Sequence, residues 1–399
     1  MYYVKGILYF CLSYLFKFVF TLETTNNSKT ITSKIFNIYG ANSIPFYVGI
    51  NQTFCTFQLD LQNDITYISS SSFQNSPYLM TQSIIINNKT YSARKIRTTA
   101  VFHSNYNSIK NFILYFIPPN TIDQATSYET LTLSFNSINN DKDSNLLRSL
   151  YETNQIDSKQ FTVGYNQGDL VFQFGENTLV TKDKKNSNKI ECNVKKNKWG
   201  CQLNAIEIKG TNGNVIKGIY TKLNYVLFNL KHNKIYVPYI IYREIENTVL
   251  KDYLANQTCA KSKVDSSLSY YCFCNLIEYF PEFMFYLEKG AVQLKSKLLF
   301  INFDGICVFL MKVNERSPNE FEFGASFVNQ FITEFDYETK SVTLYESDSE
   351  TKGKIFNDIR CIFVEYYNIM KNVLMLLSCV LLISCICNII ILVKKVINI

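Results

Sequence analysis

Short runs of hydrophobic residues, separated by polar turns, fill most of this 399-residue chain. Runs of this length that are rich in Phe, Tyr, Ile and Val predict β-strands. Clear examples are Phe46–Ile50, Phe54–Leu61, Phe112–Ile117, Asp169–Phe174 and Gln202–Ile208.

Helical patterns are confined to a few short stretches. Leu146–Tyr151 is a short amphipathic segment, and Tyr239–Leu254 is a longer one that begins just after Pro238, a residue favoured at helix starts. Strands and helices do not alternate along the chain. The pattern therefore predicts a mostly β protein with short helices.

Two segments 169 positions apart repeat one strand-turn-strand pattern. Counted from Asp60 and from Asn229, each has Leu at the next position, Tyr at the seventh and a β-branched residue at the eighth. Such a repeat predicts a duplicated lobe, with each copy giving one loop to a shared site. The two copies differ in chemistry, because one presents a carboxylate and the other an amide.

Both ends of the chain carry membrane-related patterns. Residues 1–22 combine an early Lys5 with an apolar run and predict a secretory signal peptide. Residues 373–393 are almost free of charge and long enough to cross a bilayer, and 394–399 begin with two lysines that place this tail in the cytosol. We therefore expect a single-pass membrane protein of the secretory pathway or cell surface, with its bulk outside the cytosol.

The remaining composition fits this compartment. Of twelve Cys, eight lie between the signal peptide and the span, and an even number there predicts disulfides whose pairing cannot be deduced from sequence alone. Four sequons for N-glycosylation lie in the same region, at Asn26, Asn51, Asn88 and Asn256.

The net charge of +7 has one local concentration, the Lys-rich segment 182–198. We interpret it as a solvated loop between two lobes, with an anionic partner as the alternative, and no nucleic-acid-binding module accompanies it. This composition break divides the chain into an N-terminal lobe at 36–180 and a C-terminal lobe at 181–348. A juxtamembrane linker is expected at 349–372.

Several segments together resemble the pepsin-like aspartic proteases, in particular their membrane-anchored members, over about residues 40–346. Phe321–Asp336 is similar to the family's late LGDxFLRxYYxxFD element and Val342–Tyr345 to its closing strand. The other matching parts are Leu147–Phe161, Gly168–Gly175 and Trp199. The resemblance implies a bilobal pepsin-like fold, mostly β with short helices.

The resemblance also bears on the cysteines. Cys274 and Cys307 are spaced like the family's second-lobe disulfide. Cys192 with Cys201 and Cys259 with Cys272 would close short loops, which leaves Cys55 and Cys361 unassigned.

The family's catalysis requires two carboxylates that share one proton. Its loops contain Asp-Thr-Gly or Asp-Ser-Gly, whereas this chain has Asp60-Leu61-Gln62 and Asn229-Leu230-Lys231. Asn229 cannot exchange a proton near neutral pH, the two leucines replace hydroxyl residues that brace the loops, and Gln62 and Lys231 replace glycines. Loss of one member of such a unit costs orders of magnitude in rate.

The chain contains few of the residues that other kinds of catalytic site require. His103 and His232 are its two histidines, which is too few for a multi-His zinc site and gives little for a Ser–His or Cys–His nucleophile. We expect no metal and no cofactor. Lys231 or His232 could instead neutralise Asp60, since an isolated buried carboxylate is costly. The alternative is that both are ordinary solvent-facing loop residues.

A hairpin at residues 83–92 lies where the family has its flap, a hairpin that covers the substrate. Tyr91 is the candidate tip residue of this flap, and an ordinary strand Tyr is the alternative. Together these features predict an inactive aspartic-protease-like ectodomain that keeps a cleft for a peptide or protein ligand. The first alternative is an atypical endopeptidase that uses Asp60, and the second is a purely structural or adhesive surface protein.

Overall fold

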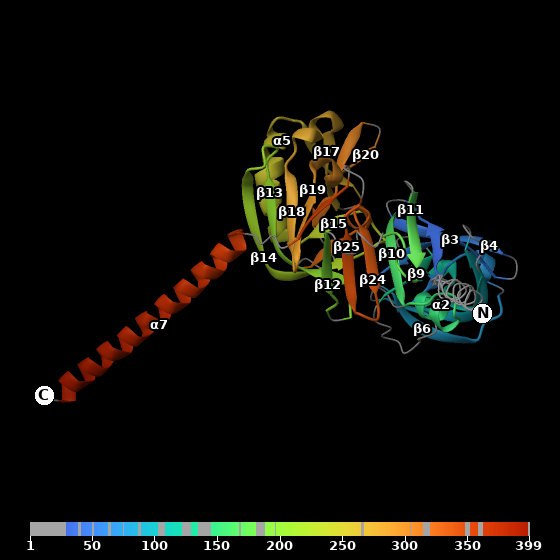
Figure 1. Cartoon of the computed structure of the whole chain (residues 1–399), viewed down its shortest axis with the longest axis horizontal. Coiled ribbons are helices and arrows are strands. Elements are labelled where there is room, and N and C mark those ends of the chain that lie inside the picture. Colours follow the sequence, from blue (N-terminus) through green and yellow to red (C-terminus); the bar gives the residue numbers. More distant parts are fainter. Residues whose placement is uncertain are drawn as a thin grey trace, which may run out of the picture.

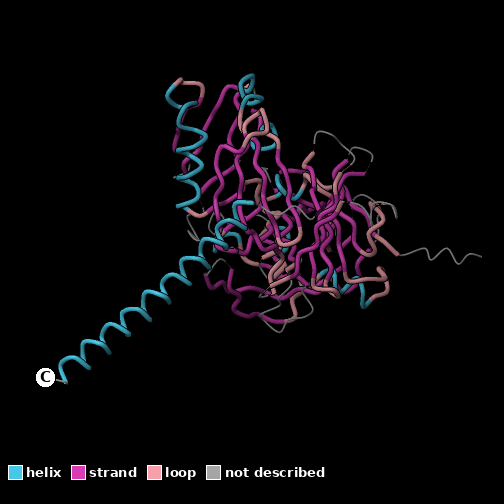
Figure 2. The backbone as a smooth tube through the Cα atoms, turned by 60° about the vertical axis from the view of Figure 1, so that its left-hand side comes forward, coloured by secondary structure: helices cyan, strands magenta, loops and turns pink. Residues whose placement is uncertain are grey.

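The computed structural model describes residues 29–38, 41–49, 52–62, 65–74, 76–86, 89–102, 108–121, 129–134, 145–166, 169–180, 188–195, 197–264, 267–303, 305–313, 320–347, 352–357 and 362–397. The predicted signal peptide and the sequons at Asn26, Asn51 and Asn88 lie outside these ranges, as do His103 and Cys361. Strands make up most of the described body, with short helices at its periphery and one long helix leaving it (Figures 1 and 2).

A six-stranded sheet joins the two halves of the chain. Its strands, in order, are β1 (Ile31–Lys34), β11 (Asp169–Phe174), β10 (Gln160–Asn166), β24 (Ile332–Asp336), β25 (Ser341–Tyr345) and β12 (Lys189–Asn193). The first three belong to the N-terminal part of the chain, up to residue 180, and the last three to the part that follows it. The halves meet where β10 and β24 pair antiparallel, with Phe161 opposite Phe335.

Each half adds an eight-stranded sheet of its own. The first-lobe sheet contains β2 (Phe36–Ile38), β3 (Ala41–Val48), β4 (Thr53–Asp60), β9 (Thr130–Thr132), β5 (Tyr67–Ile68), β8 (Ser108–Phe116), β7 (Lys89–Phe102) and β6 (Met80–Ile86), in that order. The second-lobe sheet contains β22 (Met311–Val313), β15 (Ile235–Val237), β23 (Phe321–Phe323), β14 (Val215–Phe228), β13 (Gly200–Lys209), β18 (Glu282–Leu287), β19 (Gly290–Leu294) and β26 (Lys354–Asn357).

The predicted duplication appears in the strand pairing of these two sheets. In the first lobe, β4 runs parallel to β9, and β5 pairs antiparallel with β9 and parallel with β8. In the second lobe, β14 runs parallel to β23, and β15 pairs antiparallel with β23 and parallel with β22. The strand-turn-strand segments that contain Asp60 and Asn229 therefore occupy equivalent places in two copies of one topology.

An aromatic cluster fills the junction between the lobes. The fully buried Trp199 packs edge-on against Phe161 and Phe335, and its indole N–H donates to the carbonyl of Leu133 in the first lobe at 2.8 Å. The Tyr337 hydroxyl reaches across in the same way to the carbonyl of Ser134. The inter-lobe sheet is thus backed by buried rings that contact both halves.

The second lobe carries a smaller sheet and most of the helices. The small sheet has the order β16 (Cys259–Val264), β17 (Ser267–Phe273), β21 (Ile306–Phe309) and β20 (Phe300–Phe303). The segment predicted helical forms α4 (Tyr239–Ile245), a π-helical turn (Glu246–Leu250) and α5 (Lys251–Ala255). In the first lobe the predicted short helix is α2 (Leu146–Glu152), and α6 (Ala325–Val328) follows β23.

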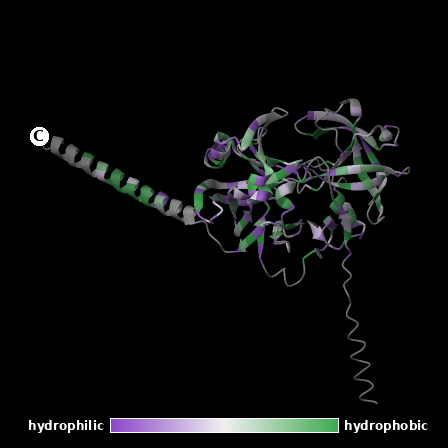
Figure 3. Ribbon diagram, turned by 90° about the horizontal axis from the view of Figure 1, so that it is seen from above, coloured by the Kyte–Doolittle hydropathy of each residue, from purple (hydrophilic) through white to green (hydrophobic). Residues whose placement is uncertain are grey.

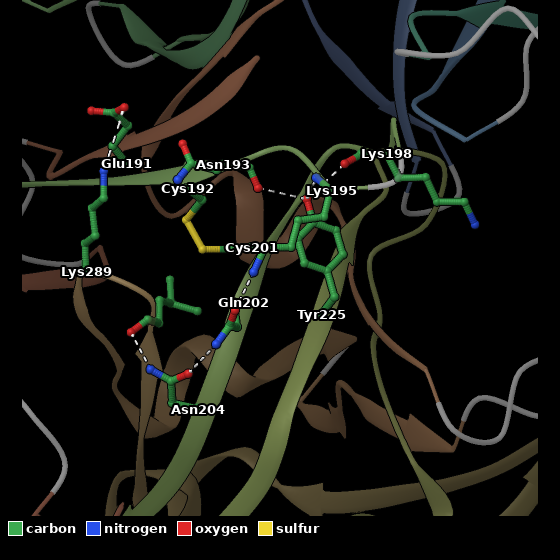
Figure 4. Close-up of a disulfide and its surroundings, with 11 residues drawn as sticks. Glu191, Cys192, Asn193, Lys195, Lys198, Cys201, Gln202, Asn204, Tyr225 and Lys289 are labelled. Atoms are coloured by element: carbon green, nitrogen blue, oxygen red, sulfur yellow. Dashed lines mark hydrogen bonds and ion pairs between the residues drawn. A yellow bond between two sulfur atoms is a disulfide. The ribbon is translucent and has the colours of Figure 1, made fainter. Parts of the chain in front are cut away.

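Three disulfides form among the described residues, and they are the three pairs considered from the sequence. They join Cys192 to Cys201, Cys259 to Cys272 and Cys274 to Cys307. The first closes the turn between β12 and β13, where the Tyr225 hydroxyl accepts from the Lys195 backbone N–H and contacts the Asn193 and Lys198 carbonyls (Figure 4). Cys55 is an unpaired thiol in β4, and its burial, together with the nearby Glu129, raises its pKa to about 12.

The last part of the chain contains more structure than a linker. Within the segment expected at 349–372, β26 pairs with β19 as the edge strand of the second-lobe sheet. The helix α7 (Ile362–Ile397) then leaves the body, with hydrophobic residues along its middle (Figure 3). Within the part of the chain that the structure describes, no helix is long and apolar enough to cross a membrane, so the predicted span at 373–393 stays a prediction.

Candidate functional site

Asp60 ends strand β4 and lies almost completely buried, with 1% of its side chain exposed. Its Oδ1 accepts the backbone N–H of Gln62 at 2.8 Å, and its own carbonyl accepts the N–H of Leu133 at 2.8 Å. A carboxylate that accepts an N–H two residues on fixes the turn that follows. The first loop is therefore held in place by its own Asp.

Asn229 repeats this geometry in the second lobe. Its Oδ1 accepts the backbone N–H of Lys231 at 2.8 Å, as Asp60 does with Gln62. An amide oxygen serves this turn as well as a carboxylate oxygen does, because either one only has to accept a hydrogen bond. The substitution of Asn for Asp thus keeps the loop conformation and changes the group that the turn presents.

Lys231 forms an ion pair with Asp60 across the two loops. Its Nζ lies 3.1 Å from Asp60 Oδ2 and 6.0 Å from the centre of the Tyr67 ring. Burial would lower the pKa of Lys231, but the charge of Asp60 and the contact with Tyr67 outweigh burial, and the pKa is raised. The hypothesis that Lys231 neutralises Asp60 is confirmed, and the alternative of a solvent-facing Lys231 is wrong.

The two leucines of the loops are core residues. Leu61 and Leu230 are both buried, at 2% and 0% exposure. The resemblance implies hydroxyl residues at these positions that brace the loops, and here another residue supplies a brace. Gln62 donates its side-chain amide to the carbonyl of Phe228, the residue before Asn229, at 3.1 Å.

His232 pairs with a carboxylate other than Asp60. Its Nδ1 accepts the backbone N–H of Lys234 at 3.2 Å, so the ring proton lies on Nε2, which donates to Glu322 Oε1 at 3.0 Å. The Asn229 amide donates to the same Glu322 oxygen. Burial would raise the pKa of Glu322, but the hydrogen bonds from His232 and Asn229 outweigh burial, and the pKa is lowered.

Glu322 was not anticipated from the sequence, although a signal for it exists. It lies in the Phe321–Gly324 segment between two fully buried Phe residues, where an unpartnered charge would be costly. It also faces Leu227 across β14 and β23, at the place that Thr130 occupies opposite Gln58 in the first lobe. The second lobe therefore places a carboxylate where the first lobe has a hydroxyl residue.

Gly324 permits the close packing of this second loop. A Cβ added there would lie 2.4 Å from the Lys234 carbonyl oxygen and 2.5 Å from that of His232. The Gly324 and Ala325 N–H groups donate to those same two carbonyls. The first lobe has the buried Thr132 opposite Asp60 instead, so it tolerates a side chain where the second lobe does not.

The flap-like hairpin is present as β6 and β7. Tyr91 lies in β7 opposite Ile84 and is 7% exposed, in a cluster that also contains Tyr67. Tyr91 is therefore a buried strand residue and does not lie at the tip of the hairpin, because the β6–β7 pairing continues beyond it to Ile86 and Lys89.

The site as built holds one ion pair and one further carboxylate that accepts hydrogen bonds from an imidazole and an amide. Asp60 is paired with Lys231, and Glu322 is held by His232 and Asn229. No described carboxyl pair shares a proton here, and the described residues contain no group of three or more potential metal ligands. The arrangement can fix the loops and orient polar groups, and the charged group that contacts Asp60 is the Lys231 ammonium.

Comparisons with known proteins agree on the fold. The structure of basic 7S globulin from soybean superposes with a TM-score of 0.60 at 10% sequence identity, covering 82% of this chain and 98% of the globulin. At this identity the likeness shows the fold alone, which is the bilobal pepsin-like one. No protein-family model matches the sequence. No curated protein matches it either.

Replacing Lys231 by Met should destabilise the protein by about 3 kcal/mol near neutral pH, because Asp60 would be left buried without its cation. The loss should shrink as the pH falls and the Asp60 carboxyl is protonated. Chemical denaturation at neutral and acidic pH measures both effects.

Lys251→Met on the exposed surface of α5 is the matched control and should stay within about 0.5 kcal/mol of the wild type. Adding Asp60→Asn to Lys231→Met should recover most of the lost stability, since no buried charge remains. An unchanged stability in Lys231→Met would contradict the role given to the ion pair.

Proposed function

We propose that this protein is a membrane-anchored ectodomain of pepsin-like fold that does not cleave peptides and binds a peptide or protein ligand. The observation that carries the absence of cleavage is the ion pair between Lys231 and Asp60, with a nitrogen–oxygen distance of 3.1 Å. The pepsin-like fold supports ligand binding, because it presents strand edges to which an extended chain can pair.

Loss of cleavage follows from the protonation chemistry of the site. Acid–base catalysis by a carboxyl dyad needs one carboxylate to activate water and one carboxylic acid to protonate the leaving amine. Asn229 supplies no acid, and Lys231, with its raised pKa, stays a cation that holds the charge of Asp60. The endopeptidase alternative would require this ion pair to open and a new acid to enter.

Ligand binding is supported by the outer strand of the flap-like hairpin. β6 lies at one edge of the first-lobe sheet and contains no charged residue and no Pro, the usual devices that block strand addition. Met80 and Ile85 are exposed on it, at 50% and 61%. The ligand class that fits is an extended, largely uncharged peptide segment that adds a strand beside β6.

Membrane anchoring is supported by the sequence of α7. Its apolar side chains from Val373 to Ile386 are exposed, as is Ile389, and the uncharged run extends to position 393. Lys394 and Lys395 then end the run on what would be the cytosolic side. The three disulfides support a secretory-pathway or extracellular location for the body.

Purified full-length protein in detergent should leave a mixed peptide library uncut between about pH 3 and about pH 7, the range in which carboxyl dyads work. Mass spectrometry of the products checks this, with Asp60→Ala as the matched variant. Cleavage by the wild type that disappears in Asp60→Ala would overturn the non-catalytic assignment in favour of the atypical endopeptidase.

Peptides selected from a displayed random library on the full-length protein should bind along β6. Met80→Lys with Ile85→Lys should weaken their binding at least about ten-fold, or about 1.4 kcal/mol, because charges on an edge strand oppose pairing. Phe54→Lys is the control, an exposed apolar residue on the interior strand β4. Equal affinity in all three proteins, measured by titration, would rule out this edge as the binding surface.

The full-length protein should stay in the membrane pellet after alkaline carbonate extraction. Leu377→Arg with Leu382→Arg should shift it to the soluble fraction, since each Arg near a bilayer centre costs about 2.5–3.5 kcal/mol. Leu377→Val with Leu382→Val should behave like the wild type. Wild-type protein in the supernatant would contradict the proposal of a membrane anchor.

A further inference from the structure

The small sheet of the second lobe presents an apolar outer face. Phe273 on β17 lies opposite Ile306 on β21, which lies opposite Phe303 on β20. Directly opposite residues of antiparallel strands project from the same face, so the three side chains form one row across three strands. All three are more than half exposed, at 59%, 51% and 59%.

The same face continues inward with further apolar residues. Tyr271, Val308 and Ile301 form the next outward row and are partly buried. The opposite face is anchored in the core by Tyr270 and Phe309 and by the Cys259–Cys272 and Cys274–Cys307 disulfides. The row is thus held rigidly at the surface, and an exposed apolar patch of this kind usually has something to cover it.

The sequon at Asn256 lies at the edge of this face. Asn256 ends α5 and is exposed, and Gln257 turns the chain through a left-handed conformation with φ of 57°. Thr258, the third sequon residue, then accepts the backbone N–H of Phe273 on its carbonyl at 3.2 Å. The last residue of the sequon, Thr258, is therefore hydrogen-bonded to Phe273, the first residue of the apolar row.

A narrow crevice with no room for a water molecule adjoins the same corner. It is lined by Tyr253, Thr258, Phe280 and the Cys259–Cys272 disulfide among others. Tyr279, 70% exposed, lies next to it, since its carbonyl accepts the Tyr253 hydroxyl at 2.9 Å. Figure 1 shows α5, β17 and β20 together at this end of the second lobe.

We infer that Asn256 carries an N-linked glycan and that its first sugars lie on the apolar face formed by Phe273, Ile306 and Phe303. The sequence pattern, the exposure of the Asn and the neighbouring aromatic residues all meet at this corner. The C–H faces of sugar rings suit the negative faces of aromatic rings. The far end of the row, on β20, lies three strand spacings from β16, or roughly 14 Å at the usual strand spacing.

The covalent step is a glycosyl transfer. The side-chain amide nitrogen of Asn256 forms a bond to C1 of the first N-acetylglucosamine of a lipid-linked oligosaccharide. The bond from C1 to the lipid diphosphate breaks, the lipid diphosphate leaves with the electron pair, and the amide nitrogen loses one proton. A transferase of the secretory pathway catalyses this transfer from the lipid-linked donor in its membrane, so the inference depends on the secretory location in the proposed function and not on ligand binding or absence of cleavage.

The test uses the full chain expressed through the secretory pathway of a eukaryotic cell. Mass spectrometry of the peptide that contains Asn256 should find a glycopeptide in the wild type and in Thr258→Ser, which keeps the sequon, and none in Asn256→Gln. An unmodified Asn256 in protein with its three disulfides intact overturns this inference alone. Reduced cysteines together with no sugar at any sequon would overturn the secretory location as well.

Hydroxyl-radical labelling of Phe273 then tests the placement of the sugars. Labelling should be low in the intact glycoprotein and stay low after trimming to a single sugar, because that sugar covers the ring. It should rise at least about two-fold after an amidase removes the whole glycan. Equal labelling in all three forms would show that the sugars lie elsewhere, and the apolar face would then be left for a protein partner.

Discussion

The antiparallel pairing of β10 with β24 is the contact on which the rest of the molecule depends. It joins strands that lie about half a chain apart into one sheet, with Phe161 opposite Phe335 and Trp199 packed against both rings. Because the lobes share this sheet, the loops that end β4 and β14 are brought face to face without a separate interface. The contacts of Lys231 with Asp60 and of Gln62 with Phe228 are possible only because the two loops lie this close together.

Electrostatics and turn geometry make separate demands on the residues where the two loops meet. Two buried carboxylates at short distance repel unless they share a proton, whereas a carboxylate and an ammonium attract. Here the Asp60 carboxylate holds its turn and pairs with a cation, and Asn229 holds its turn through its amide oxygen while its amide nitrogen binds Glu322. The backbone requirements of the two loops are therefore separable from the charges that the loops present.

How much of this follows from the sequence depends on the range of the interactions involved. The strand-turn-strand repeat at Asp60 and Asn229, the short helices and the three disulfides follow from local patterns and from the resemblance, and the structure has all of them. The ion pair could be framed as a hypothesis because an isolated Asp60 would be costly. The position of Glu322 between two Phe residues indicates that it needs a partner, but the sequence does not identify that partner, because the contact with His232 spans 90 positions.

The position of β26 has a mechanical consequence. Four residues separate its end at Asn357 from the start of α7 at Ile362, which limits the distance between these two residues to about 18 Å. A pull transmitted along the helix therefore meets little slack and acts first on the pairing of β26 with β19, at the edge of the second-lobe sheet. An edge strand can be peeled away one hydrogen bond at a time, so this short strand is the weakest link in the load path and would yield before the lobes that it tethers.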